Sequence, residues 1–415
     1  MGGARSGGLL HHCKSVRILG QSGVRVNPLH NSAPRDFMAS VATSVATSVA
    51  TSVATSVATS VANSNDLLRY PADALIAFGH TLLRKAGVRD DIGHDVATIL
   101  VEGDLLGHNT HGLALLPGYL AEIDKGAMAK SGEPTVITAR AATQAWDGNR
   151  LPGPWLTLRA LDAAMAMADA CGTGTVVIRR SHHIACLAAY LQRATDQGRM
   201  ALIYCSDPAT HSVAPFGGVS SVFTPNPFAA GRPTSGDPIL LDISASYTTN
   251  GMTARLHKAG EKLPHPWVQD AQGNATSDPG VLFSEPKGTL LPLGGLEGGH
   301  KGYALALLVE AMTGGLAGFG RADPSEGWGA TVFVQVMDPA AFGGSAPFAR
   351  QMDWLVDACH DATPRPGVER VRLPGENGLK RRRDQTANGV ALFPAIMPSL
   401  QSWAERFEVA LPAAL

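Results

Sequence analysis

The middle of the chain carries the pattern that most constrains the fold, because helix and strand signals alternate there. An Ala- and Met-rich segment from Pro154 to Ala170 has the composition of a helix, and Gly172 can end it in the left-handed conformation. It is followed by a β-type run at 175–178, a polar loop at 179–183, a predicted helix at 184–197 and an apolar strand at 200–204. Strand, loop, helix and strand in this order are typical of an α/β protein.

Helices are predicted on both sides of this unit. Pro71 begins a helical pattern that Gly87 ends, so the folded part of the chain begins with helices. Further helices are predicted at 91–106, 112–125, 302–316, 350–358 and 394–407, and further strands at 238–242 and 331–337.

Residues 1–64 do not have the pattern of a folded domain. Ala-Thr-Ser-Val units repeat from Val41 to about Val61, and these residues offer no apolar face to a helix or a strand. No acidic residue precedes Asp36, a bias that resembles an organelle-targeting peptide, but the apolar core of a secretory signal is missing. We therefore expect either a disordered tail or a start site assigned too early, with Met38 as the true start.

The composition excludes two classes of protein. Lys and Arg total 34 and Asp and Glu total 35, so the basic excess of a nucleic-acid-binding surface is missing. The sequence contains no run of about 18 apolar residues, so no membrane span is predicted. Its five cysteines are scattered and form no C-x-x-C pair, which indicates a reducing compartment, and we expect a cytoplasmic protein.

The glycine-rich stretches do not match the common nucleotide-binding motifs. Gly172-Thr-Gly174 follows a predicted helix and precedes a strand, the reverse of the order that a Rossmann fingerprint requires. The stretch from Gly294 to Gly302 lacks the order of a Walker loop. The residues therefore argue against a Rossmann or P-loop protein.

Two histidine pairs and one lysine are the candidates for chemistry. His108 and His111 flank a short polar turn, and His182 and His183 lie between a predicted strand and a predicted helix. A histidine there can donate a proton near neutral pH, and a helix N-terminus can hold a cofactor phosphate. Lys301 begins an apolar helix expected to be buried, where a cation indicates an anionic partner. The simpler alternatives are a capped helix with surface histidines and a lysine that extends into solvent.

Six blocks in a fixed order resemble those of the malate/L-lactate dehydrogenase family, over residues 66–410. The family includes ureidoglycolate dehydrogenases, sulfolactate dehydrogenases and cyclic-imine 2-carboxylate reductases. The blocks here are GHNTHGLALLPGY at 107–119, SHHI at 181–184, APFGG at 214–218 with NP at 226–227, LDISAS at 241–246, HKGYAL at 300–305 and LPGE at 373–376.

The resemblance implies an α/β fold outside the Rossmann class and an oxidoreductase that uses NAD or NADP. It implies an N-terminal helical part at 65–145, a central cofactor-binding part at 146–345, and a C-terminal part at 346–415 that packs with the N-terminal helices. A homodimer, a small 2-oxo or 2-imino acid as substrate and no metal are also implied. The residues that match the family's site are His183 and His111 as catalytic groups, Thr110, Tyr119 and His182 for substrate, and Ser206, Asp242, Ile243, Ser244 and Lys301 for cofactor.

Several residues depart from the family pattern. Leu115 stands where the family has an arginine that binds the substrate carboxylate, and His182 replaces an asparagine. Thr224 and Pro225 change the residues before Asn226, and the loop at 206–213 is longer than usual. Arg180 or Arg255 could replace the missing arginine. The basic run Lys380–Arg383 could bind the 2′-phosphate of NADP, although a solvated helix face is the stronger interpretation.

The sequence supports a 2-hydroxy/2-oxo acid dehydrogenase first and leaves three alternatives. One is a cyclic imino-acid reductase of the same family. Another is a metal-dependent hydrolase whose ligands are His108, His111, His182 and His183, although adjacent histidines on a strand would point apart. The third is a protein that binds dinucleotide without catalysis, an alternative that remains because Leu115 replaces the arginine that binds the substrate carboxylate.

Overall fold

The computed structural model describes residues 67–325 and 327–415. The expectations for residues 1–64 lie outside these residues. No helix of the described part is long and apolar enough to cross a bilayer.

A mixed seven-stranded sheet forms the centre of the fold. Its strands, in spatial order, are β2 (Thr135–Ala139), β3 (Thr143–Asp147), β4 (Thr173–Ser181), β11 (Ala330–Met337), β5 (Met200–Ser206), β6 (Pro227–Arg232) and β7 (Ile239–Ser244). Only β3 and β4 pair in parallel. β11 lies between β4 and β5 and is antiparallel to both. Its residues 330–334 are all buried, as expected of a central strand. The sheet and its covering helices confirm the prediction of an α/β protein.

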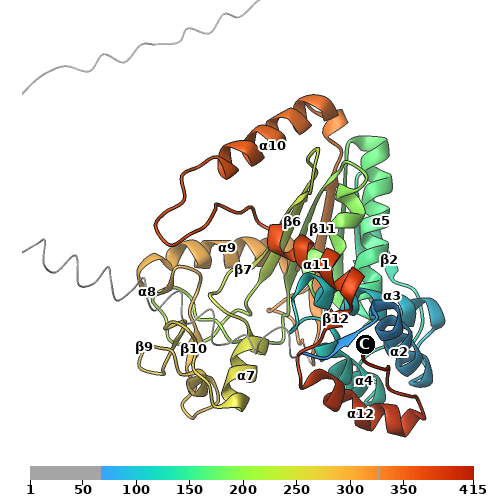
Figure 1. Ribbon diagram of the computed structural model, residues 1–415, viewed down its shortest axis with the longest axis vertical. Coiled ribbons are helices and arrows are strands. Elements are labelled where there is room, and N and C mark those ends of the chain that lie inside the picture. Colours follow the sequence, from blue (N-terminus) through green and yellow to red (C-terminus); the bar gives the residue numbers. More distant parts are fainter. Residues whose placement is uncertain (1–66, 326) are drawn as a thin grey trace, which may run out of the picture. The chain divides into compact units, whose positions relative to one another are not determined.

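Helices from both ends of the chain cover one region of this sheet. α5 (Gly153–Cys171) packs on β4 and β11, and α3 (Asp90–Leu106) packs on α5 and on α2 (Ala72–Lys85). Two C-terminal helices return to these, because α11 (Glu376–Asn388) contacts α3 and α12 (Ile396–Phe407) contacts α2 and α4 (Leu116–Asp124) (Figure 1). β1 (Arg69–Tyr70) also pairs with β12 (Val390–Ala391). The boundary expected between 145 and 146 falls inside β3.

A smaller unit joins the far edge of the sheet. Its three-stranded sheet has the order β10 (Thr289–Leu290), β8 (Val268–Gln269) and β9 (Ala275–Thr276). Around it lie α7 (Asn250–Ala259), α8 (Gly295–Gly298) and α9 (His300–Glu310). Its own small core includes Val213, Phe223, Val268 and Leu290. Two-residue strands leave almost no periodic signal, so these elements were not predicted.

The predictions of helices at 184–197 and 302–316 were wrong in part. Instead of a continuous helix at 184–197, the chain forms a 3₁₀ turn at Leu187–Tyr190 and the four-residue α6 (Gln192–Thr195), after Ala185 adopts a φ of 59°. The helix expected at 302–316 begins at His300 and becomes a π-helix at Ala311–Gly315, and it buries only part of its surface, through Gly302, Ala306, Val309 and Thr313. Its Leu307 and Leu308 are 47% and 46% exposed. α10 (Ser345–His360) is longer than predicted and buries none of its residues.

Candidate active site

The turn after α3 presents His108 and His111. Gly107 ends the helix with a φ of 90°, and the N–H of His111 donates to the carbonyl of His108 at 2.7 Å. Asp104, inside α3, accepts the N–H of Leu113 at 2.7 Å. A side chain at Gly112 would overlap this carboxylate, which explains the glycine there. The buried carboxyl group of Asp104 therefore holds the turn in place.

The environment of Asp104 is unusual for a carboxylate. Its side chain is buried and only one of its oxygens has a hydrogen-bond partner. Burial raises the pKa of Asp104 from 3.8 to about 7, although the Leu113 N–H and the charge of Arg255 oppose the shift. Asp104 therefore carries a proton for much of the time near neutral pH.

His182 and His183 follow the last residue of β4, so they do not alternate as strand residues do. The carbonyls of both lie against Gly153 at the start of α5, where any side chain would collide with them. Both imidazoles contact the indole of Trp328, with ring centroids 5.2 Å away for His182 and 4.8 Å for His183. The two rings therefore contact the same indole, whereas adjacent residues within a strand would point to opposite faces of the sheet.

His183 is held by Tyr119 and by its own loop. The Tyr119 hydroxyl donates to the carbonyl of His183 at 3.1 Å and lies 3.0 Å from its Nδ1. The Ala185 N–H also donates to this Nδ1, at 3.2 Å. The ring is stacked on that of His111 with centroids 5.9 Å apart. Burial, and then the nearby His111 and His182, lower the pKa of His183 well below its ordinary value, so the ring is neutral at pH 7.

His111 and His182 are also biased toward the neutral form. Burial first, and then His108 and Arg255, lower the pKa of His111, against the attraction of Asp242. Burial and the charge of Arg150 lower the pKa of His182 to about 4, although a Glu122 oxygen lies 3.8 Å from its Nε2. The side chain of His182 has no exposed surface and neither ring nitrogen has a hydrogen-bond partner within the described residues. It is placed to support Tyr119 and Trp328.

Two adjoining cavities open beside these histidines. The first, of about 450 Å³, is lined by His108, Thr110, His111, Ala185, Cys186, Leu187, Pro227, Asp242, Ile243, Ser244, Ser246, Tyr247, Thr248, Thr249, Met252, Trp267 and Leu293. The second, of about 580 Å³, is lined by Leu106, Gly107, His108, Ala188, Leu240–Ile243, Arg372–Gly375, Asn377, Gly378 and Arg381. They share His108, Asp242 and Ile243. Hydroxyl and imidazole donors at one end and guanidinium groups at the other suit a dinucleotide, which has a polar reacting end and phosphates.

The structure separates the predicted site residues into groups. His111, Thr110, Asp242, Ile243 and Ser244 line the first cavity. His183 and Tyr119 lie behind His111. These two residues line neither cavity, and the same holds for His182, Ser206 and Lys301. Lys301 is exposed on α9, next to Gly302, whose N–H donates to the carbonyl of the lining residue Leu293.

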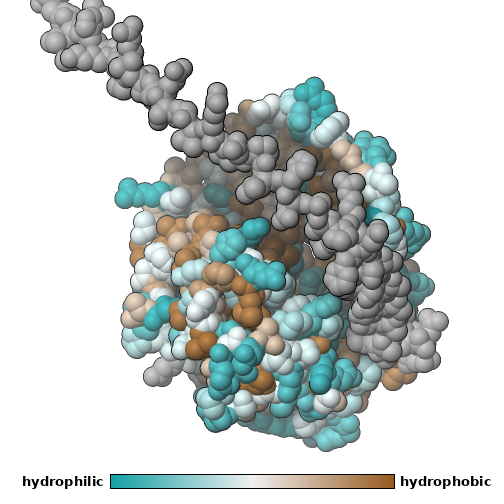
Figure 2. All heavy atoms as spheres, turned by 90° about the vertical axis from the view of Figure 1, so that its left-hand side faces the viewer, coloured by the Kyte–Doolittle hydropathy of each residue, from teal (hydrophilic) through white to brown (hydrophobic). Residues whose placement is uncertain are grey.

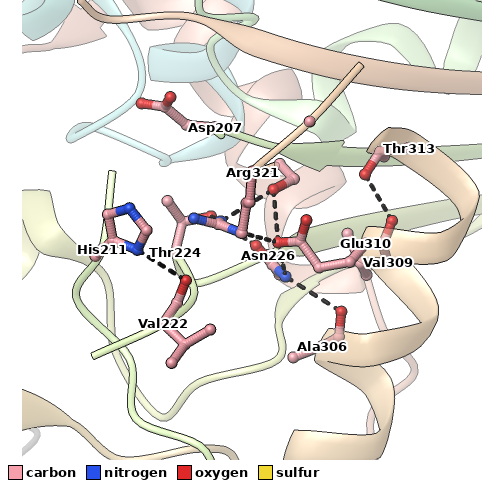
Figure 3. A network of polar contacts seen from close by, with 12 residues as sticks. Asp207, His211, Val222, Thr224, Asn226, Ala306, Val309, Glu310, Thr313 and Arg321 are labelled. Carbon is pink, nitrogen blue, oxygen red and sulfur yellow. Dashed lines mark hydrogen bonds and ion pairs between the residues drawn. The ribbon is translucent and has the colours of Figure 1, made fainter. Parts of the chain in front are cut away.

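Ser206 belongs to a polar network instead. Its hydroxyl donates to Glu310 at 2.8 Å, and Arg321 and Asn226 donate to the same carboxylate oxygen at 2.8 and 2.9 Å. Thr224 donates to Asn226 at 2.6 Å. Figure 3 shows the side chains of Thr224, Asn226, Glu310 and Arg321 gathered together at the end of α9. The network ties α9 to the sheet, and Thr224 is part of it.

Neither arginine proposed to replace the family's carboxylate ligand lines the first cavity. Arg180 is paired with the buried Asp147 at 2.6 Å. Arg255 donates to the side chain and the carbonyl of Asn109 at 2.7 and 2.9 Å, so it supports the histidine turn. Leu115 packs against the core. In the part of the chain that the structure describes, no Lys or Arg lines the first cavity.

Some lining residues were missed from the sequence. Thr248, Thr249 and Met252 come from the start of α7, where the Thr249 side chain caps the helix by accepting the N–H of Met252. A threonine before Asn250 is a helix-start signal that could have predicted this wall. Trp328 gave no signal, because its role depends only on tertiary contact.

A metal centre built from the four histidines is not supported. Within the described residues, the cluster with ligand spacing is His108, Cys186 and Asp242, whose ligand atoms lie within 4.8 Å of one another. Burial and the charge of Asp242 raise the pKa of the Cys186 thiol well above its ordinary value, and the thiol donates to Asp242 at 3.6 Å. A protonated thiol is a poor metal ligand.

Comparison with known proteins supports the same conclusion. A sequence model described as malate/L-lactate dehydrogenase matches residues 70–401. The L-lactate dehydrogenase of Cupriavidus necator is 32% identical over 80% of this chain and 96% of its own. The Δ1-pyrroline-2-carboxylate reductase of Ancylobacter novellus is 29% identical over 81% and 98%. The solved malate dehydrogenase of Pyrococcus horikoshii superposes with a TM-score of 0.75 at 27% identity, over 83% of this chain and 97% of its own. These relatives are oxidoreductases, which leaves the hydrolase alternative without support.

Proposed function

Because the chain belongs to the malate/L-lactate dehydrogenase family, and is therefore an oxidoreductase, we propose that it moves a hydride between NAD(P) and C2 of a small 2-hydroxy or 2-oxo acid. The observation that carries this proposal is His183, a neutral imidazole stacked on His111, which itself lines the first cavity. A bound nicotinamide would supply or accept the hydride. The two adjoining cavities would hold it, with its reacting end near His111.

His183 is the proposed acid and base. When the substrate is oxidised, its hydroxyl proton must leave as the hydride leaves, and a neutral imidazole can take it. Two groups compete for Nδ1 of His183. The Ala185 N–H donates to an unprotonated Nδ1, which places the ring proton on Nε2. The Tyr119 oxygen can instead accept a hydrogen bond from a protonated Nδ1. A proton on Nδ1 frees Nε2 to act as the base. In the reverse direction the protonated ring gives its proton to the new alkoxide.

The first cavity supports a small substrate held by hydroxyl and imidazole groups. Thr110, His108 and Thr248 line it, and no Lys or Arg of the described residues does. Thr110 also hydrogen-bonds Nδ1 of His111 at 2.9 Å, which orients that ring. Reduction of a cyclic imino acid is the second candidate, since a relative named as a pyrroline-2-carboxylate reductase is nearly as similar as the lactate dehydrogenase. In that reaction His183 would protonate the nitrogen.

The homodimer implied by the family is part of the proposal. Leu296, Leu307, Leu308 and Leu316 on and beside α9 are each about half exposed, although α9 is rich in apolar residues. Exposed apolar clusters of this kind are typical of interfaces. Figure 2, which faces the side where α8 and α9 lie in Figure 1, shows apolar patches at the surface. We assign a second copy of the chain to this face. The cytoplasmic location stays a prediction.

A substrate panel tests the function. Small 2-oxo acids and cyclic imino acids would each be incubated with NADH and with NADPH while nicotinamide absorbance is followed. Turnover of a 2-oxo acid supports the main proposal, and turnover of imino acids alone supports the second candidate. Binding of cofactor without any turnover would contradict both and favour a chain that only binds dinucleotide.

A further inference from the structure

The second cavity contains two arginines without a partner. Arg372 and Arg381 both line it, and within residues 67–325 and 327–415 neither takes part in a hydrogen bond or an ion pair. A guanidinium is charged at every physiological pH. Two such charges on one cavity therefore favour an anion in it.

The neighbouring arginines, unlike Arg372 and Arg381, form ion pairs with carboxylates in the described part of the chain. Arg382 pairs with Glu102 at 2.5 Å and Arg383 pairs with Asp237 at 2.9 Å, so two of the four residues of the basic run Lys380–Arg383 form ion pairs within the fold. Arg370 likewise pairs with Glu376. Arg381 instead lies against Gly107, where any side chain would collide with its guanidinium. It is thus held beside the turn that bears His108.

The cavity that the two arginines line adjoins the cavity that His111 lines. The first cavity holds His111 and joins the second through His108 and Asp242. A dinucleotide with its nicotinamide near His111 would extend its adenosine end toward the second cavity. NAD and NADP differ only there, by a phosphate on the 2′-oxygen of the adenosine ribose.

The charges in the second cavity decide between the two cofactors. An acidic side chain selects the free 2′-hydroxyl of NAD, and arginine accommodates the 2′-phosphate of NADP. Among the described residues, Asp242 is the one carboxylate that lines this cavity, and its Oδ2 accepts the N–H of Ala188 at 2.8 Å. We propose that Arg372 and Arg381 bind the 2′-phosphate, so that the enzyme prefers NADP(H) to NAD(H). This inference rests on the proposed function.

Direct binding measurements test the inference without turnover. NADPH and NADH are titrated into the full chain and followed by nicotinamide fluorescence. We expect NADPH to bind about 10- to 100-fold more tightly, as charge-assisted hydrogen bonds to a phosphate allow. The Arg372→Gln/Arg381→Gln variant loses this preference and keeps its affinity for NADH. Lys380→Gln, an exposed change on the same helix, keeps the preference.

A second probe isolates the phosphate. Calorimetry with adenosine 2′,5′-bisphosphate and with 5′-AMP shows the same preference in the wild type and its loss in the double variant. Equal affinity of the wild type for NADPH and NADH, or an equal loss of both in the variant, overturns the inference and leaves the proposed function standing. Failure of both dinucleotides to bind the wild type overturns the two together.

Discussion

The hydroxyl of Tyr119 contacts His183 at two points, 3.1 Å from its carbonyl and 3.0 Å from its Nδ1. The phenol has one proton, which it donates to the carbonyl, so its oxygen is left to accept from Nδ1. Tyr119 is fully buried, and burial raises its pKa well above the ordinary value, so it stays protonated in this role. It is a positioning residue that favours the protonated ring of His183.

Tyr119→Phe removes this acceptor and leaves only the Ala185 N–H at Nδ1. The protonated ring then loses a hydrogen bond, so the pKa of His183 falls further. In the reducing direction, which needs the protonated ring, we expect the pH optimum to move to lower pH. The turnover number at pH 7 should fall about 5-fold with little change in KM, since one hydrogen bond is worth about 1 kcal/mol.

The pH profile of kcat separates this effect from a loss of packing. Tyr204→Phe, on β5, serves as the control and should leave the profile unchanged. A Tyr119→Phe enzyme with lower thermal stability but an unshifted pH optimum would show that the hydroxyl has only a structural role.

The two adjacent histidines should behave differently when substituted. His183→Ala removes the proposed acid and base, so the turnover number should fall about 10²- to 10⁴-fold while the cofactor still binds. His182→Asn, which restores the residue usual in the family, should lower turnover much less. Because His182 is fully buried against Tyr119 and Trp328, the Asn variant should mainly lower the melting temperature. The opposite ranking of turnover would move the proton donor to His182.

The exposed leucines of α9 provide a test of the dimer. Leu307→Glu/Leu308→Glu places two charges on the face assigned to the second copy, and we expect sedimentation velocity to show monomers where the wild type shows dimers. Leu411→Glu is the matched control, an exposed leucine near the C-terminus. A wild-type monomer, or a double variant that still dimerises, rules out this interface.

The sequence predicted elements well where apolar residues are continuous or periodic. β4, β5 and β11 are such elements and lie at the centre of the sheet. β6 reads PFAAGR and α11 buries only Leu379 and Gln385, so neither has an apolar pattern to detect. The short strands around Val268 depend on tertiary pairing alone.

Residues of the candidate site were likewise predicted where a local motif marks them and missed where only tertiary contact does. His111 and His183 come from local motifs, and the structure stacks their rings although the two residues lie 72 positions apart in the sequence. Ser206 was expected at the cofactor but bonds Glu310, 104 positions away, a partner that no local pattern indicates. Trp328 and Asp104 were missed for the same reason, since their roles come from what packs against them.

Asp104 should make stability depend on pH in the direction opposite to an ordinary carboxylate. Its pKa is about 7 in the folded chain and 3.8 as its ordinary value, so the folded state binds the extra proton between these limits. The contribution of this bound proton to the free energy of unfolding is therefore fully present below about pH 4 and is lost as the pH rises through 7. The loss amounts to a few kcal/mol, on the order expected for a shift of this size.

Asp104→Asn keeps an oxygen for the Leu113 N–H and removes the charge. We expect its free energy of unfolding, measured in urea, to exceed that of the wild type at pH 8 and to approach it at pH 5. Asp357→Asn, at an exposed position of α10, should show no such difference between the two pH values. If Asp104→Asn is destabilising by the same amount at both pH values, the carboxyl is ionised in the fold and the charge itself holds the histidine turn in place.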